Sequence, residues 1–229
     1  MTILVLLPGL GGTGELFEPF LAALGSAVAT KVIRYPANGA LGYDALAAFV
    51  RAALPVGEPY VLLGESFSGP IAISLAAEGG AQLQGLVLCC SFACNPRPSL
   101  GLFRVLLPLV PVVPRPLGPL AWLLMGRLAT AALRQALAQA LRQLAPDALK
   151  ARLRAVMSVD VSAELRQVTV PILYLHATED RVVPDAELRH IRRIRPDTRV
   201  VSIRAPHFLL QTRPEEAAQA VLDFIRQAG

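Results

Sequence analysis

The residue best placed for chemistry is Ser66, which stands where a strand-like run gives way to a helix-like run. The strand-like residues are 60–63 and the helical pattern covers 66–77. A sharp turn between them leaves little room, and the small residues Gly64 and Ser68 relieve the crowding. Such a turn lifts the serine hydroxyl beside the first amides of the helix, where negative charge is favoured. The pattern predicts a nucleophilic serine.

A nucleophilic serine needs a base, because its hydroxyl is un-ionised at neutral pH. The chain has three histidines, His176, His190 and His207. His190 lies among arginines in a helical pattern, so a solvated position is expected. His207 follows the last strand-like run and His176 ends the one before it, so both reach the sheet edge where function gathers. The order of elements favours His207 as the base, with His176 lining the site.

The imidazole in turn needs a carboxylate that orients it and stabilises its charged form. Asp180 and Glu179 both follow the fifth strand-like run, and both are plausible by position. Asp185 is a third candidate, although it is better placed to cap the helix that follows. Asp160 lies before the strand and is a remoter candidate.

A loop rich in glycine, residues 7–14, follows the first strand-like run. Glycines allow backbone to approach a substrate closely, and two amides aimed at a carbonyl oxygen form an oxyanion hole. One amide is expected from Phe67, directly after the serine, and the other from this loop. Gly9, Gly11 and Gly14 match the spacing of a dinucleotide-binding fingerprint. No acidic residue ends the second strand-like run about 20 residues on, so nucleotide binding is not expected.

The elements that position these residues alternate along the chain. The strand-like runs are nearly continuously apolar, as strands buried on both faces should be. Strands are expected at 3–7, 31–35, 60–63, 85–90, 171–176 and 199–203. Helices are expected at 14–24, 43–54, 66–77, 185–194 and 213–227. This alternation predicts an α/β fold with a mostly parallel sheet and helices on both faces.

A segment of different character, about residues 95–160, interrupts the alternation. Its first half is rich in proline, and helices are expected at 120–144 and 148–157. Prolines and two arginines within 100–125 argue against a membrane span. A helical cap over the sheet edge is expected instead, and contact of the cap with a membrane surface is a less favoured alternative.

Composition limits the remaining classes. The 229 residues are 54% hydrophobic and 17% charged, which excludes disorder and predicts one domain over 1–229, with core 1–94 and 161–229. The net charge is +5, but no basic stripe with interleaved aromatics indicates nucleic-acid binding.

Targeting and cysteine use point to the cytoplasm. Residues 1–8 lack the basic region and length of a signal peptide. Cys89, Cys90 and Cys94 crowd into one apolar stretch and suit neither a disulfide framework nor a zinc site. Buried, reduced thiols are expected, which favours a reducing compartment. No metal or organic cofactor is expected.

The chain resembles the α/β-hydrolase superfamily along nearly its whole length. The matching motifs are Pro8-Gly9-Leu10-Gly11-Gly12, Gly64-Glu65-Ser66-Phe67-Ser68-Gly69, Thr178-Glu179-Asp180-Arg181-Val182-Val183-Pro184 and Ala205-Pro206-His207-Phe208-Leu209. The resemblance implies that Ser66 is the nucleophile, Asp180 the acid and His207 the base. It also implies that the amides of Leu10 and Phe67 form the oxyanion hole.

The chain departs from the family pattern at several positions. Pro8 replaces the histidine usual before the glycine of the oxyanion loop, and Ser68 replaces the second glycine of the elbow. His176 stands where relatives generally have glycine. The first strand, 3–7, corresponds to the third strand of the family, so a six-stranded sheet is expected.

The resemblance implies a serine hydrolase that cleaves a carboxylic ester through an acyl-enzyme. Open alternatives are a thioesterase or acyltransferase with the same triad, a perhydrolase-like enzyme or a lyase, and a ligand-binding protein without turnover. The expected partner is a small ester or thioester with an apolar group. Gly9, His176, Trp122 and Phe208 are expected to contact it. The apolar cap residues predict a hydrophobic pocket; they are Leu100, Phe103, Leu106, Leu107, Val110, Trp122, Leu123 and Met125.

Overall fold

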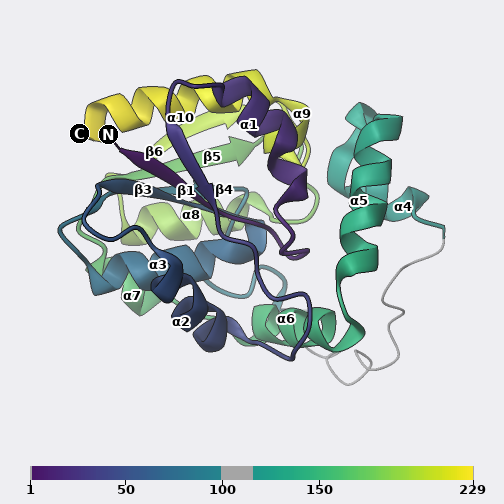
Figure 1. The fold of residues 1–229 in the computed structure, drawn as a ribbon, viewed down its shortest axis with the longest axis horizontal. Helices are drawn as coiled ribbons and strands as arrows, with labels where there is room; N and C mark the ends of the chain where they lie inside the picture. The colour runs from purple at the N-terminus through teal and green to yellow at the C-terminus, as the bar shows by residue number, and fades with distance from the viewer. Residues whose placement is uncertain (1, 99–115, 229) are drawn as a thin grey trace.

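The computed structural model describes residues 2–98 and 116–228, which form a six-stranded parallel sheet with helices on both faces (Figure 1). The strand order is β2-β1-β3-β4-β5-β6. All five neighbouring pairs are parallel. The strands are β1 (Ile3–Leu7), β2 (Ala29–Val32), β3 (Tyr60–Glu65), β4 (Leu83–Cys89), β5 (Ile172–Ala177) and β6 (Arg199–Ile203). The predicted six-stranded sheet of an α/β fold is therefore confirmed.

The second strand lies earlier than the apolar pattern predicted. Residues 29–32 pair with β1, although most of β2 is exposed because it is an edge strand. Ile33 and Tyr35 are buried, which is why the sequence pattern favoured 31–35. The amide of Tyr35 donates to the carbonyl of Gly12 at 2.9 Å. These residues thus pack against the glycine-rich loop after leaving the strand.

Two helical layers cover the sheet and build separate cores. On one face lie α1 (Glu18–Leu24), α9 (Leu209–Thr212) and α10 (Pro214–Ala228). On the other face lie α2 (Tyr43–Ala53), α3 (Gly69–Glu78), α7 (Ser162–Gln167) and α8 (Asp185–Ile194). Figure 1 shows α1 and α10 above the sheet and α3 below it. Apolar burial on both faces explains the continuously apolar strands.

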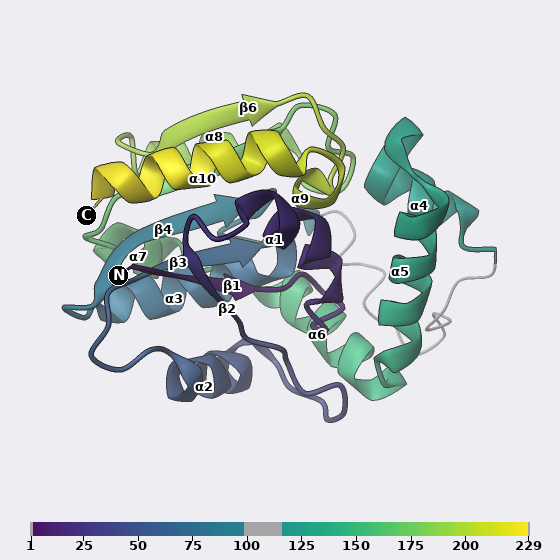
Figure 2. The same cartoon turned by 45° about the horizontal axis from the view of Figure 1, so that its top comes forward.

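Three further helices, which we call the cap helices, stand beyond the carboxyl ends of the strands (Figure 2). They are α4 (Gly118–Met125), α5 (Ala131–Gln143) and α6 (Pro146–Ser158). The helix predicted over 120–144 is two helices, because Gly126 has a left-handed φ of 55° at the end of α4. Thr130 then caps α5, its side chain accepting the amide of Leu133 at 3.1 Å.

Short 3₁₀ segments complete the described chain: η1 (Glu15–Phe17), η2 (Ser66–Ser68) and η4 (Gly126–Leu128). Prolines begin several helices, since Pro70 lies in the first turn of α3 and Pro146 starts α6. No helix within residues 2–98 and 116–228 is both long and apolar enough to cross a membrane.

Candidate active site

Three side chains from three separate loops meet in a hydrogen-bonded line at the carboxyl edge of the sheet. Ser66 follows β3, Asp180 follows β5 and His207 follows β6. Ser66 Oγ lies 2.9 Å from His207 Nε2, and His207 Nδ1 lies 2.7 Å from Asp180 Oδ2. A carboxylate only accepts, so Nδ1 carries the proton and Nε2 is left to accept the serine hydroxyl.

The orientation of Asp180 is set by its own loop. Its Oδ1 accepts the amides of Val182 and Val183 at 2.7 and 3.0 Å. Its Oδ2 is then free for the histidine. The side chains of both Asp180 and His207 are only 4% exposed, so little water competes for this contact.

The other acids considered from the sequence are engaged elsewhere. Glu179 pairs with Arg204 at 2.8 Å on the surface. Asp185 accepts from His176 Nε2 at 3.0 Å. Asp160 joins a bridge with Cys94, away from the sheet edge. Of the four candidates, the structure brings Asp180 alone to His207.

The turn that carries Ser66 is tightly built. Ser66 has a left-handed φ of 49°, which is rare and strained for a residue with a side chain. A Cβ at Gly64 would lie 2.8 Å from the carbonyl oxygen of Ser68, so only glycine fits there. Ser91 Oγ donates to the carbonyl of Ser66 at 2.6 Å. The strained conformation predicted from the small residues is present and is held by this contact.

The loop between β1 and η1, residues 8–14, is bound to the elbow on both sides of the serine. Ser68 Oγ donates to the carbonyl of Pro8 and lies 2.5 Å from the hydroxyl of Tyr35. On the other side, the amide of Gly9 donates to Glu65 Oε2 at 3.2 Å. The departure of Ser68 from glycine therefore supplies a hydroxyl that holds the loop.

A buried arginine from α6 holds the same loop, and the sequence pattern did not indicate it. Arg152 is 1% exposed, and its guanidinium donates to the carbonyls of Leu10 and Pro36 at 2.8 and 2.9 Å. It lies 5.5 Å from the ring centre of Tyr35. Burial lowers the pKa of Arg152. A Cβ at Gly12 would lie 2.5 Å from the guanidinium, so this glycine makes room for the arginine.

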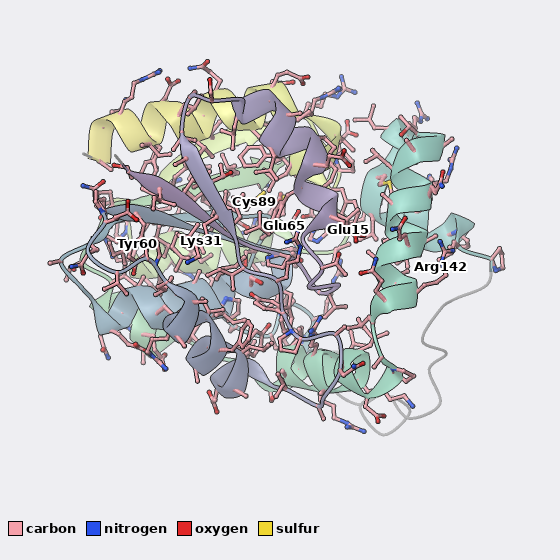
Figure 3. All side chains as sticks on the ribbon, viewed as in Figure 1. Glu15, Lys31, Tyr60, Glu65, Cys89 and Arg142 are labelled. Carbon is pink, nitrogen blue, oxygen red and sulfur yellow. The ribbon has the colours of Figure 1, made fainter. Side chains whose placement is uncertain are left out.

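Glu65, the residue before the nucleophile, is buried at the end of the sheet that faces α5 (Figure 3). Its Oε1 accepts Gln211 Nε2 at 2.7 Å, while Oε2 accepts the amide of Gly9. Burial raises the pKa of Glu65, and the hydrogen bonds and His207 partly oppose that rise. The sequence analysis gave this carboxyl no role, although an acid within a buried strand end is a signal that could have drawn attention.

A cavity of about 250 Å³ opens from Ser66 and His207 toward the cap helices. Leucines make up much of its wall: Leu16, Leu120, Leu124, Leu137, Leu141 and Leu149. Among the described lining residues, Glu65 and His207 are the only ionisable side chains. The cavity therefore suits an apolar group beside the serine.

The expected substrate contacts divide into two groups. Gly9, Leu10 and Phe208 line the cavity. Trp122 does not line it: the residue is 54% exposed and lies on the guanidinium of Arg181 at 4.0 Å. Successive helical residues point about 100° apart, so the neighbours of Trp122 face the cavity while its own ring faces out.

His176 does not line the cavity either, contrary to the prediction. Its ring lies 3.0 Å from Asp185 Oδ1 and 3.2 Å from Ser202 Oγ. His190 is half-buried, with Nε2 2.8 Å from Ser162 Oγ, rather than fully solvated as expected. Both histidines have structural partners outside the site.

Besides Trp122, two of the eight expected pocket residues lie in the described part of the chain. Leu123 lines the cavity, and Met125 is buried in a cluster with Ala121 and Leu137. The remaining candidates lie outside the described residues; they are Leu100, Phe103, Leu106, Leu107 and Val110.

The three cysteines lie at the end of β4 and in the segment that follows it. Cys89 and Cys90 are buried and Cys94 is half-buried, and all three are free thiols. The Sγ atom of Cys90, a carboxylate oxygen of Asp180 and a ring nitrogen of His207 lie within 4.8 Å of one another. Burial raises the pKa of Cys90, and the other two side chains already bind each other. A metal ion at this place would therefore have to displace the hydrogen bond between Asp180 and His207.

Comparisons with solved structures agree with this architecture. An enol-lactonase from Burkholderia xenovorans superposes with a TM-score of 0.81 at 18% identity, covering 98% of this chain and 91% of that one. The esterase RhEst1 from Rhodococcus sp. superposes with a TM-score of 0.80 at 23% identity, covering 100% and 91%. At these identities the likeness concerns the fold.

Sequence comparisons reach the same family. The biotin biosynthesis bifunctional protein BioHC of Cellvibrio japonicus is 28% identical over 242 residues, which cover 97% of this chain and 47% of that protein. The chain thus spans about half the length of this curated relative. The protein-family model described as "Alpha/beta hydrolase family" matches residues 4–220 of this chain. With a match over most of its length, the chain belongs to the alpha/beta hydrolase family.

Proposed function

We propose that the protein is a serine hydrolase that cleaves a carboxylic ester through an acyl-enzyme. The observation that carries the proposal is the line Ser66–His207–Asp180, which ends at an apolar cavity. Family membership and the neighbouring enol-lactonase and esterase structures support it. A ligand-binding protein would have no need of a serine held beside an oriented histidine.

The reaction begins at the serine oxygen. Ser66 Oγ attacks the acyl carbon while its proton passes to His207 Nε2, and the Asp180 carboxylate stabilises the imidazolium. The carbonyl oxygen becomes an oxyanion beside the amides of Leu10 and Phe67. His207 then protonates the departing alcohol, which leaves an acyl group on Ser66. Water, activated by the same histidine, releases the acid.

The substrate carries an uncharged, apolar group on its acyl or alkyl side. The cavity wall beside the serine is mostly aliphatic, and no lysine or arginine is among its described residues. An anionic tail would therefore lie in an apolar space near the carboxyl of Glu65 without a cation to pair with it. An aliphatic chain would gain about 0.8 kcal/mol for each buried CH₂ group.

The test combines a covalent probe with a set of substrates. A fluorophosphonate should add once, at Ser66, as measured by intact mass and peptide mapping, and His207→Ala should abolish the adduct. His176→Ala is the matched control, because His176 lies outside the cavity. p-Nitrophenyl esters of increasing chain length, with the corresponding thioesters, then define the substrate. An adduct elsewhere, or one that persists in His207→Ala, would contradict the proposal.

A further inference from the structure

Glu65 joins the turn that carries Ser66 to the oxyanion loop, residues 8–14, which lies directly beside it. One carboxyl oxygen accepts the amide of Gly9 at 3.2 Å and the other accepts Gln211 Nε2 at 2.7 Å. Gln211 belongs to α9, directly after the histidine turn. The Glu65 side chain therefore contacts both the oxyanion loop and the helix that follows His207. Glu65 is also the residue directly before Ser66 in the sequence.

The position of Gly9 sets the position of the next amide. Gly9 also accepts the amide of Gly12 at 3.0 Å, so residues 9–12 form a turn. The Gly9 amide is fixed by Glu65, and the adjacent peptide group carries the amide of Leu10. An oxyanion donor works only within about 2.7–3.1 Å of the developing charge. A small shift of this turn would therefore weaken the donor.

A buried carboxyl such as that of Glu65 lowers the stability of the folded protein unless it makes compensating contacts. Glu65 is 7% exposed and reaches the wall of an apolar cavity in which no lysine or arginine is among the described lining residues. Burying a carboxyl away from water costs free energy unless hydrogen bonds replace the lost solvation. Both oxygens of Glu65 have protein donors, so the group is not available as a second base for substrate.

We propose that Glu65 is a positioning residue that holds the Gly9 amide, and through it the Leu10 amide, in register with Ser66. The proposal rests on the proposed hydrolase function, because the position of the Leu10 amide affects catalysis only if an oxyanion forms beside it. Its partner Gln211 keeps the carboxyl turned toward the loop.

The test compares Glu65→Ala, Glu65→Gln and the exchanged pair Glu65→Gln with Gln211→Glu. Glu65→Ala should lower kcat about 10²-fold, as displacement of a catalytic group by about 1 Å does, with KM within about threefold. In the exchanged pair the glutamine oxygen still accepts Gly9 and its NH₂ group donates to the new carboxylate. That double variant should recover most of the kcat lost in Glu65→Ala.

Glu187→Gln is the matched control. Glu187 is 6% exposed, and burial raises its pKa as it does for Glu65, but its carboxylate contacts Cys94 rather than the loop. Its replacement should leave kcat within about twofold of wild type. Thermal unfolding of each variant separates loss of folding from loss of positioning.

Hydrogen exchange of the Gly9 amide supplies a readout that needs no turnover. Protection of this amide should fall in Glu65→Ala, return in the exchanged pair and stay unchanged in Glu187→Gln. Unchanged Gly9 protection or wild-type kcat in Glu65→Ala would overturn the positioning role. A wild-type protein without ester cleavage or a Ser66 adduct would overturn the proposed function instead, while the exchange data still decide whether Glu65 holds Gly9.

Discussion

The edge of the sheet and the cap helices that face it are built from different forces. At the edge, directional hydrogen bonds hold Asp180, His207 and the Ser66 turn. The cap helices α4 and α5 pack through a small apolar cluster around Ala121, and Phe208 touches it from the core. Polar contacts thus set the geometry of Ser66, His207 and Asp180, and apolar packing sets the shape of the space beside them.

Among residues 2–98 and 116–228, few polar contacts join these two regions. Gln143 of α5 donates to Glu15 of η1 at 2.9 Å on the surface. The amide of Phe208 donates to the carbonyl of Leu124 in α4 at 2.9 Å. Arg152 of α6 is the buried connection to the oxyanion loop. We therefore expect a change at the sheet edge to alter the chemical step of the proposed reaction, and a change in the cap to alter which substrates are accepted.

The largest effect is expected at the sheet edge. Asp180→Asn removes the charge that stabilises the imidazolium and favours the wrong tautomer of His207, so kcat should fall about 10³–10⁴-fold. The asparagine oxygen still accepts the loop amides, so the unfolding temperature should change little. Steady-state kinetics and thermal unfolding measure both quantities. Asp185→Asn is the control, and a kcat within tenfold of wild type in Asp180→Asn would contradict the assignment.

A cap substitution should act on specificity instead. Ala140 of α5 lines the cavity and is 1% exposed. Ala140→Phe shortens the cavity, so kcat/KM should fall about 10–100-fold for a long-chain ester and little for an acetate. Ala132→Phe, on the exposed side of the same helix, is the control. Equal losses for short and long esters would show that the wall does not select the chain.

The connection between the two regions can be broken at Arg152. Arg152→Met leaves the carbonyls of Leu10 and Pro36 without their buried donors, which should lower the free energy of unfolding by about 1–3 kcal/mol. The oxyanion loop should loosen, so kcat should fall as well. Urea unfolding and kinetics test this against Arg154→Met, an exposed arginine of the same helix. Unchanged stability and kcat would mean that the cap and the loop are independent.

The free energy of unfolding should depend on pH through the buried carboxyl of Glu65 at the sheet edge. Burial raises the pKa of Glu65, so the native state resists ionisation more than the unfolded chain does. Its contribution to stability is present at low pH and is lost as the pH rises through the raised pKa. Relative to wild type, Glu65→Gln should therefore gain stability as the pH rises above about 4.3, the usual pKa of a glutamate. Urea unfolding at several pH values measures the difference, and the opposite slope would contradict it.

The smallest effect is expected on the outer side of α4. Trp122→Ala removes an exposed contact with Arg181, which is worth about 0.5–1 kcal/mol. Because Trp122 does not line the cavity, kcat/KM should stay within about twofold for every ester. Leu124→Ala, two residues along and on the cavity wall, is the comparison and should alter chain-length preference. If Trp122→Ala lowered kcat/KM for some esters and not for others, Trp122 would contact the substrate after all.

Much of the sheet could be predicted from the chain alone, as could the meeting of Ser66, Asp180 and His207 at its edge. The bounds of β1, β6 and α8 agree with the predicted runs. A strand buried on both faces, such as β1, carries a strong local signal because it is apolar throughout. Parallel strands also bring their carboxyl ends to one edge, so loops far apart in sequence can be expected to meet there.

Contacts that depend on the direction of one side chain could not be predicted in this way. Arg152 and Leu10 are 142 positions apart, and nothing in helical spacing indicates that an arginine turns inward to a carbonyl. Trp122 and Leu124 are both apolar residues of α4, yet one faces out and the other faces the cavity. Apolarity alone does not tell these orientations apart.

The sequence by itself determined the α/β class and the side chains that meet at the sheet edge, because strand burial and chain order are local properties. The tertiary structure alone decided how the glycine-rich loop, residues 8–14, is held and which cap residues face the cavity. Those features arise from contacts between segments distant in sequence, such as Gly9 with Glu65. Their energies depend on packing geometry, which residue types and spacing do not specify.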